Sequence, residues 1–318
     1  MKRRARLIAM CALVLLATAP AFAQDANILM PVSEVEARMR ADSFQVLHMR
    51  GSRAEQDRTQ RVTLGFPDSV AIVVKWAKAP ARGELFNNQP RYEAAAYEFQ
   101  KLFLDEAEFV VPPTIIRSLP LSFYRTLQSD AAPTFGQTSS VVVVLQYWLT
   151  QVEPLARTDD KRFDSDSLYA RHLANTNVFS YLIKHSDSNV GNFLISSVAS
   201  NPRVFAVDNG VAFGHETGDR GTAWRELRVK RVPASTIERL RKITPEDLEK
   251  TLGVIAQFEV RNGELVAVEP GENLGPRRGV RNTKGVIQFG LTRFEINDIE
   301  TRIRRLLERV DEGKLPTF

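Results

Sequence analysis

The stretch from residue 179 to residue 214 constrains the fold more than any other part of the chain. It begins Phe-Ser-Tyr-Leu-Ile-Lys-His-Ser-Asp-Ser-Asn-Val-Gly-Asn and resumes at residue 204 with Val-Phe-Ala-Val-Asp-Asn-Gly-Val-Ala-Phe-Gly. An apolar segment leads to Asp187 and Asn192 in a tight loop, and two short strands separate this loop from Asp208. Either half alone would be explained by turn formation, since Asp, Asn and Gly are common turn residues. Together they supply two carboxylates and an amide, the set that phosphoryl transfer uses to orient a hydroxyl and hold a divalent cation.

Residues 185–194, His-x-Asp-x-x-x-Gly-Asn-x-Leu, resemble the catalytic loop of aminoglycoside and choline kinases in the protein-kinase-like superfamily. Residues 208–210, Asp-Asn-Gly, stand where protein kinases have Asp-Phe-Gly. This variant resembles the atypical branches of the superfamily: the four-jointed and Golgi casein kinase group, the toxin kinase HipA and the phosphatidylinositol kinases. At residue 186 a Ser stands where protein kinases have Arg, which predicts that control through a phosphorylated activation loop is absent.

The resemblance implies an α+β, bilobal protein-kinase-like fold. Residues 24–148 would form a small antiparallel β lobe plus one helix. Residues 149–318 would form a larger, mostly helical lobe with the catalytic loop and a C-terminal hairpin and helix. It further implies that ATP lies between the lobes, that Asp187 orients the acceptor hydroxyl, and that Asn192 and Asp208 coordinate Mg²⁺ or Mn²⁺, which are hard cations that prefer oxygen ligands.

A predicted strand at residues 69–76, Ser-Val-Ala-Ile-Val-Val-Lys-Trp, places Lys75 near its end. It resembles the Val-Ala-Ile-Lys strand, whose lysine contacts the nucleotide phosphates. A helix-forming segment follows at residues 91–104, in the position of the helix whose glutamate pairs with that lysine. Glu93 and Glu98 lie about 500° of helical turn apart and do not share a face. The resemblance favours Glu93 as the partner and leaves Glu98 in reserve.

Gly51 and Ser52 lie between the first two predicted strands, residues 44–49 and 61–64. In a kinase-like fold they would form a reduced phosphate-binding loop. The apolar run at residues 139–149 predicts a buried strand that leads into the hinge between the lobes. Further helices are predicted at residues 30–43, 167–183, 236–242, 245–253 and 294–310, and a hairpin at 258–268 turns at Asn-Gly.

Residues 269–285 are rich in Gly, Pro and Arg and are predicted to form a loop. It contains Arg277, Arg278 and Arg281. Two interpretations stay open for these arginines, a solvated loop and a basic patch for phosphate or an acidic partner.

Residues 1–23 have the pattern of a secretory signal peptide. Four basic residues precede the apolar run 7–16, and Ala21-Phe-Ala23 is a small-x-small cleavage signal. The apolar run is shorter than the roughly 20 residues of a membrane-spanning helix, so no stable span is expected after cleavage. We therefore expect an exported protein, periplasmic or secreted. The only cysteine, Cys11, lies in this leader, so the mature chain is expected to have no disulfide and no thiol nucleophile.

The net charge of +5 arises mostly from the leader, and the rest of the chain is close to neutral. Dense basic runs with interleaved aromatic residues do not occur, so nucleic acid is not expected as a partner. The expected partners are a nucleotide and a protein or small-molecule acceptor. No Ala-Pro-Glu motif follows Gly214, and the short segment there favours a small-molecule acceptor over a peptide. Because a bacterial periplasm holds little ATP, a kinase-like binding module without turnover is the alternative function.

Overall fold

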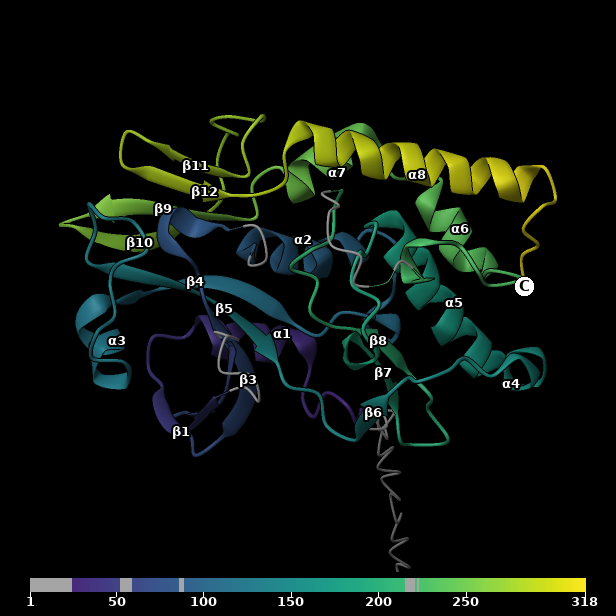
Figure 1. Ribbon diagram of the computed structural model, residues 1–318, viewed down its shortest axis with the longest axis horizontal. Helices are drawn as coiled ribbons and strands as arrows, with labels where there is room; N and C mark the ends of the chain where they lie inside the picture. Colours follow the sequence, from purple (N-terminus) through teal and green to yellow (C-terminus); the bar gives the residue numbers. More distant parts are fainter. Residues whose placement is uncertain (1–24, 52–58, 86–88, 215–220, 222) are drawn as a thin grey trace, which may run out of the picture.

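The computed structural model describes residues 25–51, 59–85, 89–214, 221 and 223–318. The two larger sheets lie in one half of the molecule with α1 and α3, and most other helices lie in the other half beside β6, β7 and β8, with α2 between the halves (Figure 1). The signal peptide predicted at residues 1–23 and Ser52 of the predicted phosphate loop lie outside the described residues. The α-helices are α1 Val32–Arg40, α2 Pro90–Gln100, α3 Leu121–Leu127, α4 Asp160–Ser165, α5 Ser167–Leu182, α6 Ala234–Leu240, α7 Pro245–Leu252 and α8 Arg293–Asp311. The strands are β1 Gln45–Gly51, β2 Thr59–Gly65, β3 Ala71–Lys78, β4 Thr114–Pro120, β5 Ser140–Tyr147, β6 Val152–Pro154, β7 Phe193–Ser196, β8 Val204–Ala206, β9 Ala256–Arg261, β10 Glu264–Val268, β11 Val280–Thr283 and β12 Val286–Phe289.

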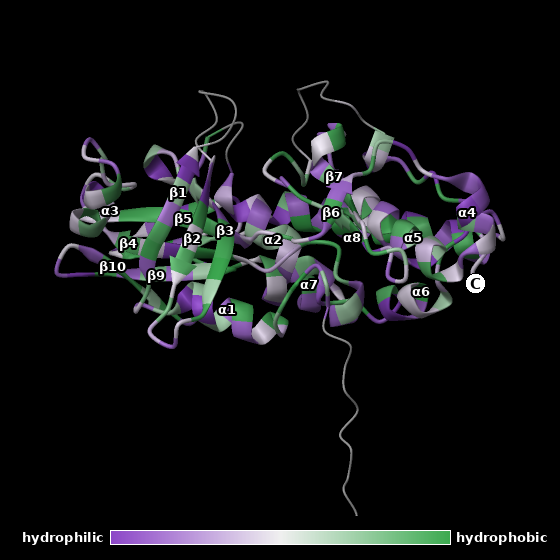
Figure 2. Cartoon of the chain, turned by 90° about the horizontal axis from the view of Figure 1, so that it is seen from below, coloured by the Kyte–Doolittle hydropathy of each residue, from purple (hydrophilic) through white to green (hydrophobic). Residues whose placement is uncertain are grey.

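The larger sheet has five antiparallel strands in the order β1-β2-β3-β5-β4. Alternate residues of β3, namely Ile72, Val74 and Trp76, are buried in a core shared with α1 and α3. Because side chains of a strand alternate between the two faces of a sheet, Lys75 lies on the opposite face, toward the helical half. Figure 2 shows the hydrophobic residues along β3 and β5 within this half of the molecule.

Strand β5 is buried along its whole length because both of its faces are covered. One face packs into the core with α1 and α3, and the other packs against a second sheet in the order β10-β9-β12-β11. Val142 and Val144 of β5 share this second core with Phe258, Ile287 and Phe289. The C-terminal hairpin, which the sequence grouped with the helical lobe, thus lies on the strands of the small lobe. Part of the loop predicted at residues 269–285 is strand β11.

Helix α2 joins the two halves of the molecule, and almost every one of its residues is buried. Tyr92, Ala95, Tyr97 and Phe99 pack into the core of the helical half, together with α5, α7 and α8. Ala94 packs into the core beneath the C-terminal sheet. Contacts with both of these cores therefore fix the position of α2.

The predicted α+β class, with a small antiparallel lobe plus a helix and a larger helical lobe, is confirmed by these elements. Helices α1, α2, α5, α6, α7 and α8 lie where sequence patterns predicted them, whereas the short helices α3 and α4 were not predicted. Leu168, an apolar residue at the start of α5, is 39% exposed. Among the described residues, no helix combines the length and apolar character needed to cross a bilayer.

A substitution at Gly290 tests the packing of the C-terminal sheet against α7. A Cβ atom at Gly290 would lie 2.1 Å from the carbonyl oxygen of Gly253, a backbone atom that cannot rotate away. We expect Gly290→Ala to lower the free energy of unfolding by about 1–3 kcal/mol, measured by urea denaturation. Gly136→Ala is the control, because nothing lies within 4 Å of that Cβ position. Equal stability of the two variants would contradict the packing described here.

Candidate active site

Lys75 and Glu93 form the ion pair that connects the sheet to α2. The ammonium of Lys75 donates to Glu93 Oε1 at 2.8 Å. Glu98, the reserve candidate, pairs with Lys101 on the same helix at 3.1 Å. The structure thus brings Glu93, and not Glu98, to Lys75, in keeping with the roughly 500° that separates the two glutamates around the helix.

Asp208 completes a cluster of three charges, in which two carboxylates flank the ammonium of Lys75. Lys75 Nζ lies 3.1 Å from Asp208 Oδ1, and the backbone N–H of Asn209 donates to Glu93 Oε2 at 3.1 Å. Asp208 has a φ of 58°, a left-handed conformation uncommon for a residue other than glycine. This conformation allows the Asp208 side chain and the next N–H to approach the same ion pair. Asn209 was not selected from the sequence, because its contact comes from the backbone.

The cluster is electrostatically coupled. Burial disfavours the charged form of Lys75, but the charges of Asp208 and Glu93 outweigh it and raise the pKa of Lys75. The ammonium of Lys75 lowers the pKa of Asp208. Burial raises the pKa of Glu93, and Lys75 and the Asn209 N–H act against this. The side chain of Asp208 is 58% exposed, so the cluster is open to solvent on the Asp208 side.

The loop after α5 carries His185 and Asp187. Helix α5 ends at Leu182, and Lys184 follows in the left-handed region, at a φ of 52°. The N–H of His185 then donates to Ser180 O at 2.9 Å. His185 is fully buried, and burial lowers its pKa to about 4, so the ring is neutral. Its Nδ1 accepts from the N–H of Asp187 at 3.4 Å, and its ring meets Phe193 edge-on. His185 therefore supports the loop from beneath.

Asn192 and Asp208 lie at the same end of a small antiparallel ladder. Strands β7 and β8 pair Phe193 with Ala206. One step further along the ladder, the N–H of Val207 donates to Asn192 O at 2.8 Å. Because this step fixes Asn192, which precedes β7, beside Val207, which follows β8, the Asn192 amide and the Asp208 carboxylate leave the ladder from neighbouring positions.

The two side chains fit a hard divalent cation by the type of their donor atoms. The Nδ2 group of Asn192 donates to the backbone oxygen of Asp187 at 3.3 Å, so Oδ1 is the atom that a cation would use. Asp208 adds a solvent-accessible carboxylate. Carboxylate and amide oxygens are the ligands that Mg²⁺ and Mn²⁺ prefer. In the described parts of the chain, no group of three or more His, Cys, Asp or Glu side chains could hold a metal. A cation at Asn192 and Asp208 would therefore need further oxygens from a ligand or water.

Gly51 is separated from the charge cluster by the width of one strand. It ends β1 and pairs with Gln60 of β2, which in turn faces Trp76 of β3. Two strand spacings place Gly51 about 10 Å from the backbone of β3. The structure therefore leaves Gly51 outside direct contact with Lys75.

The two aromatic residues at the end of β5 have different environments. Tyr147 is buried in the core with α1 and α3, and its hydroxyl accepts from the N–H of Leu29 at 3.2 Å. Trp148 is 38% exposed, and the guanidinium of Arg61 lies 4.9 Å from the centre of its ring.

The segment around Trp224 packs on the loop that carries Asp187. Local sequence patterns did not indicate this contact. The Trp224 ring stacks on Phe193 at 4.1 Å between centroids, with 9° between the planes. The N–H of Trp224 donates to the Ser188 hydroxyl at 3.1 Å, next to Asp187. The segment after Asp208 thus returns to the residues around Asp187.

A strand lysine paired with a helix glutamate, and facing an aspartate that follows a β-ladder, defines a protein-kinase-like arrangement. Searches found no matching family model and no matching curated protein. Solved structures with a similar fold include that of hydra Fam20 with sugar, with a TM-score of 0.49 and 14% identity over 91% of this chain and 92% of that chain. The Golgi casein kinase gives a TM-score of 0.48 and 13% identity over 88% of this chain and 74% of that chain. The structure of the Golgi casein kinase with Mn/ADP bound gives a TM-score of 0.47 and 12% identity over 90% of this chain and 78% of that chain.

The protonation of His172, which lies on the buried face of α5, provides a test of the packing of this helix. Burial, with the charges of Arg203 and Arg171, lowers the pKa of His172 to about 4. The ordinary value is about 6.5, so the unfolded chain binds more protons between pH 6.5 and 4. The contribution of His172 to stability is therefore complete above pH 6.5 and is lost as the pH falls toward 4.

We expect His172→Gln to flatten the decrease in the free energy of unfolding between pH 7 and pH 5, within a full effect of up to about 3 kcal/mol. Urea denaturation at several pH values measures this. His48→Gln is the control, because His48 is exposed and should leave the slope unchanged. A slope that His172→Gln does not change would show that His172 accepts a proton freely in the folded state.

Proposed function

We propose that this chain is an ATP- and metal-dependent phosphotransferase of the atypical kinase type, which transfers a phosphoryl group to a hydroxyl of a protein or a small molecule. One observation carries the proposal: the ammonium of Lys75 lies between the carboxylates of Glu93 and Asp208, at 2.8 and 3.1 Å. Residues from β3, α2 and the segment after β8 meet at this point, although 133 positions separate Lys75 from Asp208.

Lys75 would hold the nucleotide phosphates. Its raised pKa keeps it positively charged at neutral pH, and Glu93 fixes the direction of the ammonium. An ordered cation placed before the ligand arrives does not have to be reorganised during the reaction, which is the main way in which proteins stabilise phosphoryl transfer.

Asn192 and Asp208 would hold Mg²⁺ or Mn²⁺ through one amide and one carboxylate oxygen. When bound, such a cation neutralises negative charge on the phosphates. The lowered pKa of Asp208 keeps this carboxylate ionised and able to bind a cation at neutral pH.

Asp187 would orient the acceptor hydroxyl and receive its proton. Its carboxylate accepts from the N–H of Asn189 at 3.3 Å, and its own N–H is held by His185. A carboxylate held in this way can present an oxygen to an incoming hydroxyl without rearrangement. Export through the predicted leader, to a periplasm or the exterior, is part of the same proposal.

Thermal unfolding of the purified chain with Mg-ATP or Mn-ATP tests nucleotide binding. At a nucleotide concentration of about 100 times the Kd, we expect the melting temperature to rise by roughly 4–6 °C. Asp208→Asn should remove most of this rise, because it removes a charged metal ligand beside Lys75. Asp105→Asn is the matched control: this exposed acid pairs with Arg239 instead. An equal rise in wild type and Asp208→Asn would mean that Asp208 does not hold the metal.

Incubation with labelled ATP and peptide, sugar or alcohol acceptors tests turnover. Asp187→Asn should lower the transfer rate by at least about 100-fold while the ATP-dependent rise in melting temperature remains. Nucleotide binding without transfer or hydrolysis, with every acceptor and metal, would contradict the enzyme and favour a kinase-like binding module.

A further inference from the structure

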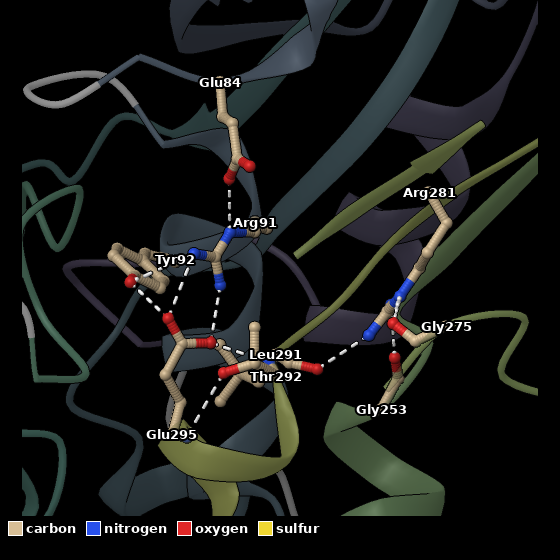
Figure 3. A network of polar contacts seen from close by, with 9 residues as sticks. All are labelled: Glu84, Arg91, Tyr92, Gly253, Gly275, Arg281, Leu291, Thr292 and Glu295. Carbon is tan, nitrogen blue, oxygen red and sulfur yellow. Dashed lines mark hydrogen bonds and ion pairs between the residues drawn. The ribbon is translucent and has the colours of Figure 1, made fainter. Parts of the chain in front are cut away.

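Arg91 lies two residues before Glu93 and is enclosed by carboxylates (Figure 3). Its Nε donates to Glu84 Oε2 at 2.6 Å. Its two terminal nitrogens donate to the two oxygens of Glu295, at 2.6 and 3.0 Å. The Tyr92 hydroxyl also donates to Glu295. We call these four residues, Glu84, Arg91, Tyr92 and Glu295, the Arg91 clasp.

Glu295 connects the clasp to the start of α8. The N–H of Thr292 donates to Glu295 Oε2 at 2.7 Å, and the N–H of Glu295 donates to the Thr292 hydroxyl at 3.3 Å, which forms a capping box. Each oxygen of Glu295 therefore accepts two hydrogen bonds. Burial raises the pKa of Glu295, but its bonds to Arg91 outweigh this and lower it, so the carboxylate is ionised.

The loop around the clasp is held by Arg281. This buried guanidinium donates to the backbone oxygens of Gly253 at 2.7 Å, Gly275 at 3.1 Å and Leu291 at 2.8 Å. Gly279 lies so close to Arg91 that a Cβ atom there would be 2.1 Å from Nε. The C-terminal segment thus encloses the Arg91 side chain with Gly279 of the loop and Glu295 of α8, which leaves little room for Arg91 to move.

Arg91 and Tyr92 of the clasp and Glu93 of the charge cluster are consecutive residues of α2. Arg91 and Tyr92 are fixed to α8, and Glu93 holds Lys75 and the N–H of Asn209. Phe213, five residues after Asp208, packs on the Tyr92 ring at 5.4 Å. A helix moves as a unit, so a shift of its first turn by a fraction of its 5.4 Å pitch would break the 2.8 Å contact to Lys75.

We infer that the Arg91 clasp positions Glu93, and that Glu295 is a positioning residue for the Lys75–Glu93 pair. The catalytic meaning of this inference rests on the proposed function. The C-terminal segment would hold the glutamate helix in place from within the chain, a task that a separate activating partner could otherwise perform. Glu295 touches neither Lys75 nor the proposed metal ligands. It acts through Arg91 and the helix that carries Glu93.

The reactivity of the Lys75 amine tests the inference without any nucleotide. Only neutral amine reacts with an acylating ester, and one unit of pKa changes the neutral fraction about tenfold. We expect Glu295→Gln to raise the acylation rate of Lys75 at least about threefold relative to exposed Lys250, measured by mass spectrometry of the peptides. Arg91→Lys, which keeps the charge but loses the two-pronged contact, should act in the same direction.

Controls separate positioning from general stability. Asp311→Asn removes an acid at the other end of α8, which pairs with Arg241, and should leave Lys75 unchanged. All variants are compared at temperatures well below their melting points. If Glu295→Gln and Arg91→Lys remain folded with lowered melting temperatures but Lys75 keeps its wild-type reactivity, the clasp is purely structural and the inference is wrong.

A double-mutant cycle tests whether Glu295 acts through Glu93. Glu93→Gln should itself raise the reactivity of Lys75, and Glu295→Gln should add less than about 1.5-fold in that background, because residues that act as a unit are not additive. Full additivity would overturn the inference. Failure of the proposed function would appear separately, as absence of nucleotide binding by the wild type, while the acylation result stands by itself.

Discussion

The ion pair between Lys75 and Glu93 is the contact on which the arrangement of the two halves depends. Taking both charges out of water costs several kcal/mol per ion, and their attraction offsets this cost only if the geometry is close. A helix that moved by an ångström would leave Glu93 as a buried charge without its partner Lys75. The structure meets this demand by packing α2 into the cores on both of its sides and by fixing its first turn through Arg91. Asp208, more exposed, balances the charge of Lys75 from the solvent side.

The remaining groups of the site are placed by backbone geometry. The ladder of β7 and β8 sets Asn192 beside the segment that carries Asp208, and the positive φ of Asp208 turns both its carboxylate and the next N–H toward α2. Neutral His185 fills the space beneath the loop. Few side chains are specific to the chemistry, and many hydrogen bonds hold them in place, as expected where catalysis depends on preorganised charge.

The sequence predicted the elements whose signals are local. The predicted strand at residues 69–76 located β3 with Lys75 near its end, helix propensity located α2, and the loop of residues 185–194 follows α5 as predicted. Contacts between distant residues have no such signal. Arg91 and Glu295 are 204 positions apart, and neither belongs to a motif. Strand β11 was hidden in a segment rich in Gly, Pro and Arg, because pairing with β12 outweighs its weak strand propensity. Leu168 fits an apolar pattern but lies at the exposed start of α5.

The burial of β5 on both faces has a consequence for the order in which the chain folds. One of its two covering layers comes from residues 256–289, more than a hundred positions later in the sequence. Until those residues leave the ribosome, Val142 and Val144 form part of an uncovered apolar face on a nascent sheet. Such surfaces aggregate or bind chaperones when they persist. The amino-terminal half therefore reaches its native packing late in synthesis, and a truncated chain ending near residue 250 would keep this apolar face exposed to water.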